Sequence, residues 1–157
     1  MPVKPIPDGY HTVTPYLFIR GAAAGLDFYK KAFGATEKLR LNGPDGKIAH
    51  AEITIGDSVI MIGDEAPHMG ARSPQMLGGS PVNLLLYVKD ADTLFKQALA
   101  AGAKEIRPLK NQFYGDRSGC LEDPFGHSWT IATHVEDVSQ EEVDHRFAEA
   151  CKKMATA

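Results

Sequence analysis

The sequence has little cysteine and no long hydrophobic run. Its 157 residues include 2 cysteines, Cys120 and Cys151, which are too few for a disulfide framework, and they form no CxxC pair. No stretch approaches the ~20 apolar residues that a membrane span requires. The first nine residues contain three prolines and no apolar run, which argues against a signal peptide. We therefore expect a cytoplasmic protein that does not bind membranes.

Clusters of basic residues are also absent. The chain has 17 lysines and arginines against 20 acidic residues, a net charge of −3, and no basic run longer than two residues. A protein that neutralises many phosphates needs a broad basic surface, so we expect no nucleic-acid partner. No GxSxG, P-loop or GxGxxG motif is present. The 43% hydrophobic and 24% charged residues are ordinary for a globular domain.

The sequence does contain two similar series of strand and helix patterns. Segments 16–35 and 85–103 share the order strand, turn, helix and Gly-Ala, with an offset of 68 to 69 residues. The turn Gly56–Ser58 likewise matches Gly126–Ser128. This repetition predicts an α+β fold of two tandem βαβββ modules, although a generic α+β domain with accidental similarity remains the alternative.

The periodicities place the expected elements along the chain. Val13, Pro15 and Phe18 lie in a predicted strand, and Pro15 places that strand at an edge or a bulge. The expected strands are 12–20, 36–41, 48–55 and 58–62, then 83–88, 105–109, 119–122 and 128–133, with helices at 22–33 and 91–101.

These elements predict five regions of the chain. They are an N-terminal extension 1–11, a first module 12–64, a linker 65–81, a second module 82–135 and a C-terminal helix 136–157. Ser139 and Glu142 form a capping box for the last helix. Its apolar stripe should pack on the body or on a partner chain, and consists of Val143, Phe147, Cys151 and Met154.

His50 and Glu52 are the candidate catalytic pair. Residues two apart in a strand project from the same face, and Ala49, Ala51, Ile53 and Ile55 on the opposite face should lie under a helix. The pair could be a base with its orienting partner, two ligands of a divalent ion, or a polar stripe in solvent. If the pair faces the concave side, binding or turnover should respond to pH between about 6 and 8, where histidines ordinarily titrate.

Two other residues have competing interpretations. Arg117 offers a rigid fork of donors for a carboxylate or phosphate ligand, unless Asp116 simply neutralises a neighbouring arginine. Trp129, the only tryptophan, is predicted to be a core residue, while its neighbour Thr130 lines a cavity on the other face. Cys120 lies among apolar neighbours and is expected to be inert.

The chain resembles the vicinal oxygen chelate superfamily, which includes glyoxalase I, extradiol dioxygenases and bleomycin-resistance proteins. The resemblance runs from about Thr12 to Val138 and is carried by TPYLFIRGAAAGLDFYKKAFGA, HAEITIGDSVIMIGDE and GDRSGCLEDPFGHSWTIATHVEDV. It is greatest for the small bacterial branch related to the phosphonate-operon protein. It implies paired βαβββ modules with curled mixed sheets around a cavity, and a homodimer.

The resemblance also locates the superfamily's usual metal ligands. By position these are Thr14, Ile60 or Met61, Asn83 and Thr130. None is the imidazole or carboxylate that a divalent ion prefers, so we predict no cofactor and no metal at these positions. A divalent metal bound elsewhere, for example through His50 and Glu52, is left open.

Three functions are consistent with these residues. The first is a metal-free protein that binds a small-molecule ligand in an apolar, aromatic pocket. The second is a metal-dependent lyase, isomerase or dioxygenase, and the third is a dimeric scaffold without a ligand. The predicted ligand-binding residues are Tyr16, Phe18, Asn83, Tyr87, Arg117 and Thr130.

Overall fold

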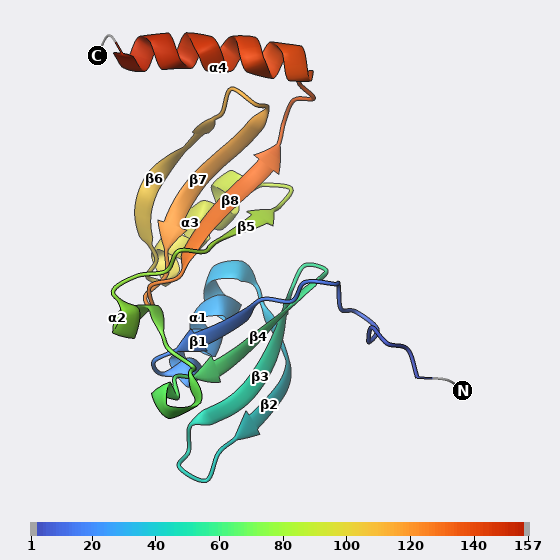
Figure 1. The fold of residues 1–157 in the computed structure, drawn as a ribbon, viewed down its shortest axis with the longest axis vertical. Helices are drawn as coiled ribbons and strands as arrows, with labels where there is room; N and C mark the ends of the chain where they lie inside the picture. Colours follow the sequence, from blue (N-terminus) through green and yellow to red (C-terminus); the bar gives the residue numbers. More distant parts are fainter. Residues whose placement is uncertain (1–2, 156–157) are drawn as a thin grey trace.

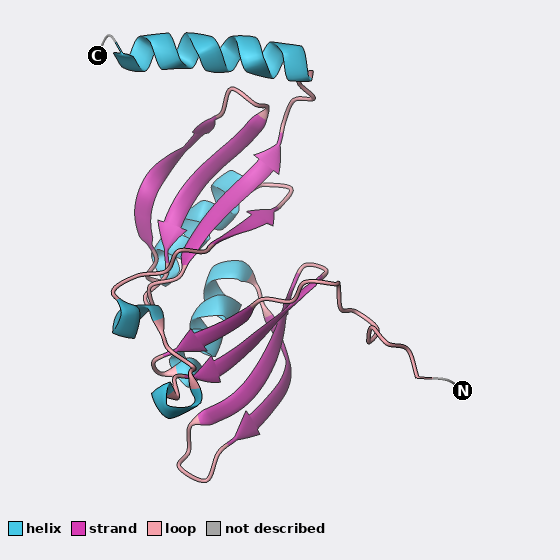
Figure 2. Ribbon diagram, viewed as in Figure 1, coloured by secondary structure: helices cyan, strands magenta, loops and turns pink. Residues whose placement is uncertain are grey.

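The computed structural model describes residues 3–155 and contains two modules with the same order of elements (Figures 1 and 2). The first module comprises β1 (Tyr16–Ile19), α1 (Ala22–Phe33), β2 (Thr36–Asn42), β3 (Ile48–Ile55) and β4 (Ser58–Asp64). The second comprises β5 (Asn83–Tyr87), α3 (Ala91–Ala101), β6 (Lys104–Asn111), β7 (Asp116–Glu122) and β8 (Ser128–His134). A short 3-10 helix, η1 (Pro67–Met69), and α2 (Pro74–Leu77) lie between the modules, and α4 (Gln140–Ala155) follows them.

Each module forms a four-stranded mixed sheet. The strand orders are β1-β4-β3-β2 in the first sheet and β5-β8-β7-β6 in the second. The first strand of each module runs parallel to the last, and the other pairs are antiparallel. Neither sheet closes on itself, so each leaves one face uncovered by its helix. The prediction of an α+β fold with two βαβββ modules and a C-terminal helix is confirmed.

Proline at the start of β1 determines where that strand lies. The predicted strand began at Thr12, but the observed strand begins at Tyr16, directly after Pro15. The Pro15 carbonyl accepts a hydrogen bond from the Met61 amide at 2.9 Å, whereas proline has no amide hydrogen to donate on the other side. β1 is accordingly an edge strand, as predicted.

Helices α1 and α3 contact each other and cover the inner faces of the two sheets, so the two modules share one hydrophobic core. The last strand of each module caps the start of its helix. Asp64 accepts hydrogen bonds from the Gly21 and Ala22 amides at 3.0 and 2.9 Å, and Thr133 accepts one from the Ala91 amide at 2.9 Å. These bonds satisfy amides that have no partner within the helix.

A buried carboxylate joins the two modules inside this core. One oxygen of Asp123 accepts hydrogen bonds from the Tyr29 hydroxyl at 2.6 Å and from Nε1 of Trp129 at 2.9 Å. Its other oxygen accepts bonds from the amides of Phe125 and His127. Burial, and then the nearby charge of Asp123, raise the pKa of Tyr29 well above its usual value. Trp129 is fully buried, which confirms its prediction as a core residue.

The structure departs from the predicted elements at two strands. β7 begins at Asp116 rather than at Gly119, so Arg117 lies within the strand and not in a preceding loop. In β3, Ala51, Ile53 and Ile55 are buried as expected, but Ala49 is exposed. A register irregularity between β2 and β3 interrupts the alternation there, because Asn42 pairs with Ile48 while Leu41 pairs with His50.

Helix α4 lies across the far end of the second module (Figure 1). Among its described residues none is buried. Arg146 joins it to the rest of the chain through an ion pair with Glu136 at 2.8 Å and a hydrogen bond to the Phe113 carbonyl at 3.4 Å, and the Phe147 ring lies 5.5 Å from that of Phe113. No helix within residues 3–155 is long and apolar enough to cross a membrane.

Candidate functional site

The open face of the first sheet, opposite α1, carries the predicted catalytic pair. Alternation along β3 directs Ala51 and Ile53 into the core and His50 and Glu52 to the open face. Tyr16 on β1 reaches the same face, because it bonds to His50 there. Glu52 is only 8% exposed, so its carboxylate is held largely out of solvent.

A chain of hydrogen bonds connects these side chains. The Tyr16 hydroxyl lies 2.9 Å from Nδ1 of His50, and Nε2 of His50 lies 3.2 Å from Glu52. The second oxygen of Glu52 accepts a hydrogen bond from the Tyr10 hydroxyl. An ionised carboxylate only accepts, so Nε2 of His50 carries a proton and, in the neutral ring, Nδ1 accepts from Tyr16.

The charge of Glu52 is stabilised by its donors. The hydrogen bond from Tyr10, followed by that from His50, holds the pKa of Glu52 below its usual range despite the opposing effect of burial. The same bond raises the pKa of Tyr10. Lys38 adds a positive charge 4.0 Å from the carboxylate and lies 4.3 Å from the centre of the Tyr10 ring. Glu52 is therefore an ionised carboxylate at neutral pH, with one donor on each oxygen.

The N-terminal extension forms one wall of a cavity at this carboxylate. The cavity has a volume of about 550 Å³, and its walls include Ile6, Tyr10, Thr14, Glu52 and Met61. Sequence reasoning missed the part that Tyr10 plays. Tyr10 precedes Glu52 by 42 residues and belongs to no motif, so the sequence gives no signal that the two side chains meet.

Aromatic rings form an apolar surface beside this polar chain. Phe18 stacks on Tyr16 with ring centroids 4.7 Å apart, and Tyr16 meets His50 edge to face at 5.4 Å. Met61 lies next to both Tyr16 and Glu52 in the sheet. The first sheet thus brings together four of the predicted site residues: Tyr16, Phe18, His50 and Glu52.

The other predicted ligand-binding residues lie on the second sheet, at two positions. Thr130 donates a hydrogen bond to Oδ1 of Asn83 at 2.9 Å, and Nδ2 of Asn83 lies 2.8 Å from the Ser128 hydroxyl. Tyr87 lies farther along β5, where it is exposed. A groove of about 210 Å³ is lined by residues of both modules, among them Thr14 and Leu85.

Tyr87 belongs to a polar cluster that sequence reasoning did not find. It donates a hydrogen bond at 2.7 Å to Asp116, which is 5% exposed and also lies 2.8 Å from Nδ1 of His134. Nε2 of His134 lies 2.9 Å from Asp137. The bond to Asp137, and then that to Asp116, raise the pKa of His134. His134 itself remains exposed.

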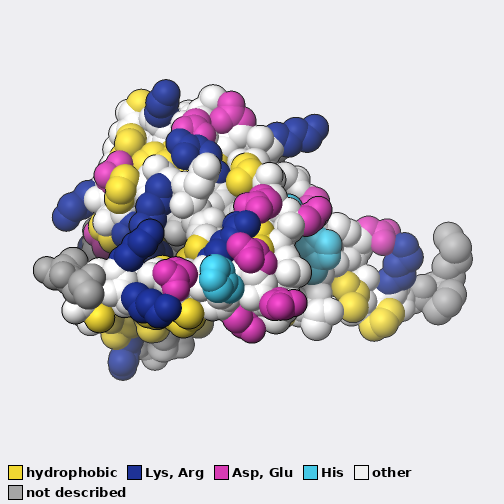
Figure 3. Space-filling view, turned by 90° about the horizontal axis from the view of Figure 1, so that it is seen from above, with side chains coloured by type: hydrophobic (Ala, Val, Ile, Leu, Met, Phe, Trp, Pro, Cys, Tyr) yellow, Lys and Arg dark blue, Asp and Glu magenta, His cyan; other side chains and the backbone are white. Residues whose placement is uncertain are grey.

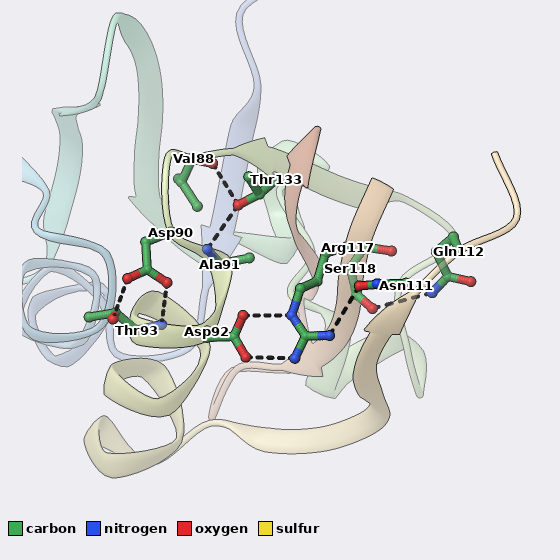
Figure 4. A network of polar contacts seen from close by, with 10 residues as sticks. All are labelled: Val88, Asp90, Ala91, Asp92, Thr93, Asn111, Gln112, Arg117, Ser118 and Thr133. Atoms are coloured by element: carbon green, nitrogen blue, oxygen red, sulfur yellow. Dashed lines mark hydrogen bonds and ion pairs between the residues drawn. The ribbon is translucent and has the colours of Figure 1, made fainter. Parts of the chain in front are cut away.

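Arg117 points away from these pockets, which corrects its assignment to the ligand site. Alternation along β7 places it on the helix side of the second sheet, where it forms a two-pronged ion pair with Asp92 of α3 at 2.6 and 2.7 Å (Figure 4). Its remaining donor lies 3.2 Å from the Asn111 side chain. The fork expected to bind a ligand instead ties α3 to the sheet, because β7 starts earlier than predicted and includes Arg117.

The usual metal positions of the resembled superfamily offer a poor donor set. Thr14 lines the first cavity, Met61 is half-buried beside Glu52, and Asn83 and Thr130 bond to each other. Hydroxyl, thioether and amide groups without a carboxylate or imidazole do not suit a divalent ion. Within residues 3–155, no group of three or more His, Cys, Asp or Glu side chains is arranged to hold a metal ion. We therefore derive no chemistry through a metal at these positions.

Comparison with known proteins identifies the family. The family model of the Glyoxalase/Bleomycin resistance protein/Dioxygenase superfamily matches residues 10–131. The chain belongs to this superfamily. The match spans both modules and includes most residues of the two open faces described above.

Individual members of the superfamily resemble the chain over most of its length. An uncharacterized protein from Mycobacterium bovis is 43% identical over 134 residues, covering 83% of this chain and 88% of the relative. The solved structure of protein PA1353 from Pseudomonas aeruginosa has a TM-score of 0.66 at 25% identity, covering 80% and 99% of the two chains. A PhnB protein from Bacillus cereus has a TM-score of 0.58 at 21% identity, covering 78% and 99%. The last likeness shows the shared fold.

Proposed function

We propose that this member of the superfamily binds a small organic molecule on the open face of its first sheet, without the superfamily's usual metal centre. The observation that carries the proposal is the buried carboxylate of Glu52, which faces a cavity of about 550 Å³. Ligand sites are typically concave and mostly apolar, with a few fixed polar groups. Glu52 lines the cavity, and on the same open face beside it the stacked rings of Tyr16 and Phe18 supply an apolar surface and His50 a second polar group.

The hydrogen-bond chain favours a particular kind of ligand. Tyr16 donates a hydrogen bond to Nδ1 of His50, so its oxygen is left to accept a bond from a ligand on the open face. Glu52 is likewise an acceptor, and both groups therefore favour a ligand with a hydroxyl or amine donor. An aromatic or aliphatic body would lie against Phe18 and Met61.

A second candidate is acid–base catalysis by the same residues. The specific observation is that His50 lies between the Tyr16 hydroxyl and the Glu52 carboxylate, with both ring nitrogens in hydrogen-bond contact. Glu52 fixes the orientation of the ring, so His50 could accept a proton that leaves a ligand through Tyr16. This reaction would require no metal ion.

Substitutions in the pair test the proposal. Small aromatic fragments with one hydroxyl or amine group, such as tyramine, are titrated into the protein while the histidine ring signals are followed by NMR. Glu52→Gln and His50→Ala should each weaken binding about tenfold, because each loses a charge-assisted or ring hydrogen bond. Melting temperatures should stay within a few degrees of the parent, since both side chains face the cavity.

Glu37→Gln provides the matched control. Glu37 lies on the neighbouring strand but faces α1, where Arg40 and then Lys30 lower its pKa to about 2. The control should bind the fragments like the parent protein. Equal binding by all four proteins would overturn the proposal. Mass spectrometry of the recovered fragment separates the two candidates, because binding returns it unchanged and catalysis does not.

We also propose that two copies of the chain associate through α4. Members of the superfamily typically form dimers, and the α4 side chains Phe147 and Met154 are 52% and 70% exposed. Sedimentation equilibrium at micromolar concentration should give twice the chain mass of 17.0 kDa, and Phe147→Glu should shift the protein toward the monomer. A parent protein that sediments at 17.0 kDa would contradict this prediction.

A further inference from the structure

The open face of the second sheet holds a pocket that is separate from the His50–Glu52 site. It has a volume of about 440 Å³ and lies over β6, β7 and the loop that joins them. Leu85, Pro108 and Phe113 form apolar parts of its wall. A volume of this size is sufficient for a ligand with one or two rings.

Two cations line this pocket and have no acidic partner. Arg107 pairs in register with Cys120, and Lys110 with Ser118, so both side chains share the open face with those residues of β7. Within the described part of the chain, neither Arg107 nor Lys110 makes an ion pair or a side-chain hydrogen bond. Arg20, Arg40, Arg117 and Arg146, by contrast, each form an ion pair.

A buried hydroxyl on β7 also lines this pocket. Ser118 is 4% exposed, and within residues 3–155 the only hydrogen-bond contact of its hydroxyl is with Tyr114 at 3.5 Å. That distance is well beyond the usual 2.7–2.8 Å of a hydroxyl–hydroxyl bond, so Ser118 retains the capacity to bond to a ligand. Asp116, the nearest carboxylate on this face of β7, is occupied by Tyr87 and His134.

From these observations we propose that this pocket binds an organic carboxylate. The carboxylate lies between Arg107 and Lys110 and accepts a hydrogen bond from Ser118, while the apolar body packs on Leu85 and Phe113. Arginine presents a planar fork that matches two carboxylate oxygens. This inference rests on the proposed function, because both assign a small-molecule ligand to an open sheet face of this fold. It uses none of the residues that line the 550 Å³ cavity at Glu52.

The cations in the pocket favour binding of an anion, although the net charge of the chain does not. In the view from above, Lys and Arg side chains lie among Asp and Glu side chains rather than in a separate field (Figure 3). With a net charge of −3, the protein has no overall attraction for anions. Selectivity must therefore come from Arg107 and Lys110 at short range, and it should weaken as salt screens them.

The test compares two ligands of nearly the same shape. 2-Naphthoate and its neutral amide, 2-naphthamide, are titrated into the full chain, with affinities measured by calorimetry and contacts by NMR. We expect naphthoate to bind at least about tenfold more tightly and to shift the signals of Ser118 and Tyr114. The double variant Arg107→Gln/Lys110→Gln should remove this preference while it leaves the melting temperature unchanged.

Lys31→Gln/Lys96→Gln serves as the matched control, because it removes the same charge from exposed positions on α1 and α3. It should bind naphthoate like the parent. Equal affinity for the two ligands, no binding of naphthoate, or an Arg107/Lys110 variant that binds like the parent would each overturn the inference. Failure of the first-pocket proposal is a different result, in which Glu52→Gln does not alter fragment binding.

Discussion

Replacing Trp129 by alanine should lower the free energy of unfolding by about 3–5 kcal/mol. Trp129 is fully buried, and its ring centroid lies 4.8 Å from that of Phe33 and 5.5 Å from that of Tyr29. Removing the indole leaves a cavity among these rings. It also removes a donor from Asp123, which remains buried at 4% exposure. Because Phe33 and Tyr29 belong to the first module, both modules lose packing.

The measurement is urea unfolding followed by far-ultraviolet circular dichroism, since Trp129 is the only tryptophan and its fluorescence is lost. Trp129→Phe is the informative companion, because it keeps most of the ring contact and loses only the bond to Asp123. We expect a smaller cost of about 1–2 kcal/mol for it. Full parental stability in Trp129→Ala, together with lost ligand binding, would show instead that this side chain serves the pocket.

The sequence predicts this core well because the core depends on local periodicity. Residues at i, i+3 and i+7 of a helix share one face whatever the rest of the chain does, so α1 and α3 match their predicted bounds. The same holds for the facing of His50 and Glu52 on β3, because alternation needs no knowledge of other strands. Trp129 follows by the same reasoning on β8.

The candidate site is less predictable because it depends on contacts between distant residues. Tyr10 reaches Glu52 only because the extension crosses the first sheet, and no local pattern records that path. Arg117 was misplaced for a different reason. The strand was predicted to start at Gly119, yet Asp116 pairs with His134 and already belongs to β7. An error of three residues at a strand end was enough to move the arginine out of the predicted site.

Gly115→Ala is expected to be the most disruptive single-methyl change, at a cost of at least about 3 kcal/mol. Gly115 has φ +101°, a conformation that costs a side chain about 1–2 kcal/mol. An added Cβ would also lie 2.1 Å from the carbonyl oxygen of Glu136, so the backbone must move. That movement would break the bonds from the Val135 and Glu136 amides to the Gly115 carbonyl, at 2.9 and 3.0 Å.

Gly102→Ala is the control that separates the cost of a positive φ from the cost of a steric clash of the added Cβ. Gly102 has a similar φ of +116°, but its added Cβ would meet only Pro124 at an ordinary 3.8 Å. The control should therefore cost only the conformational part, about 1–2 kcal/mol, in the same urea titration. Similar losses in the two variants would contradict the close approach of Gly115 to Glu136. Residues 112–114 line the 440 Å³ pocket on the second sheet. Gly115→Ala should therefore also weaken naphthoate binding under conditions where the variant is still folded, whereas Gly102→Ala should leave binding unchanged.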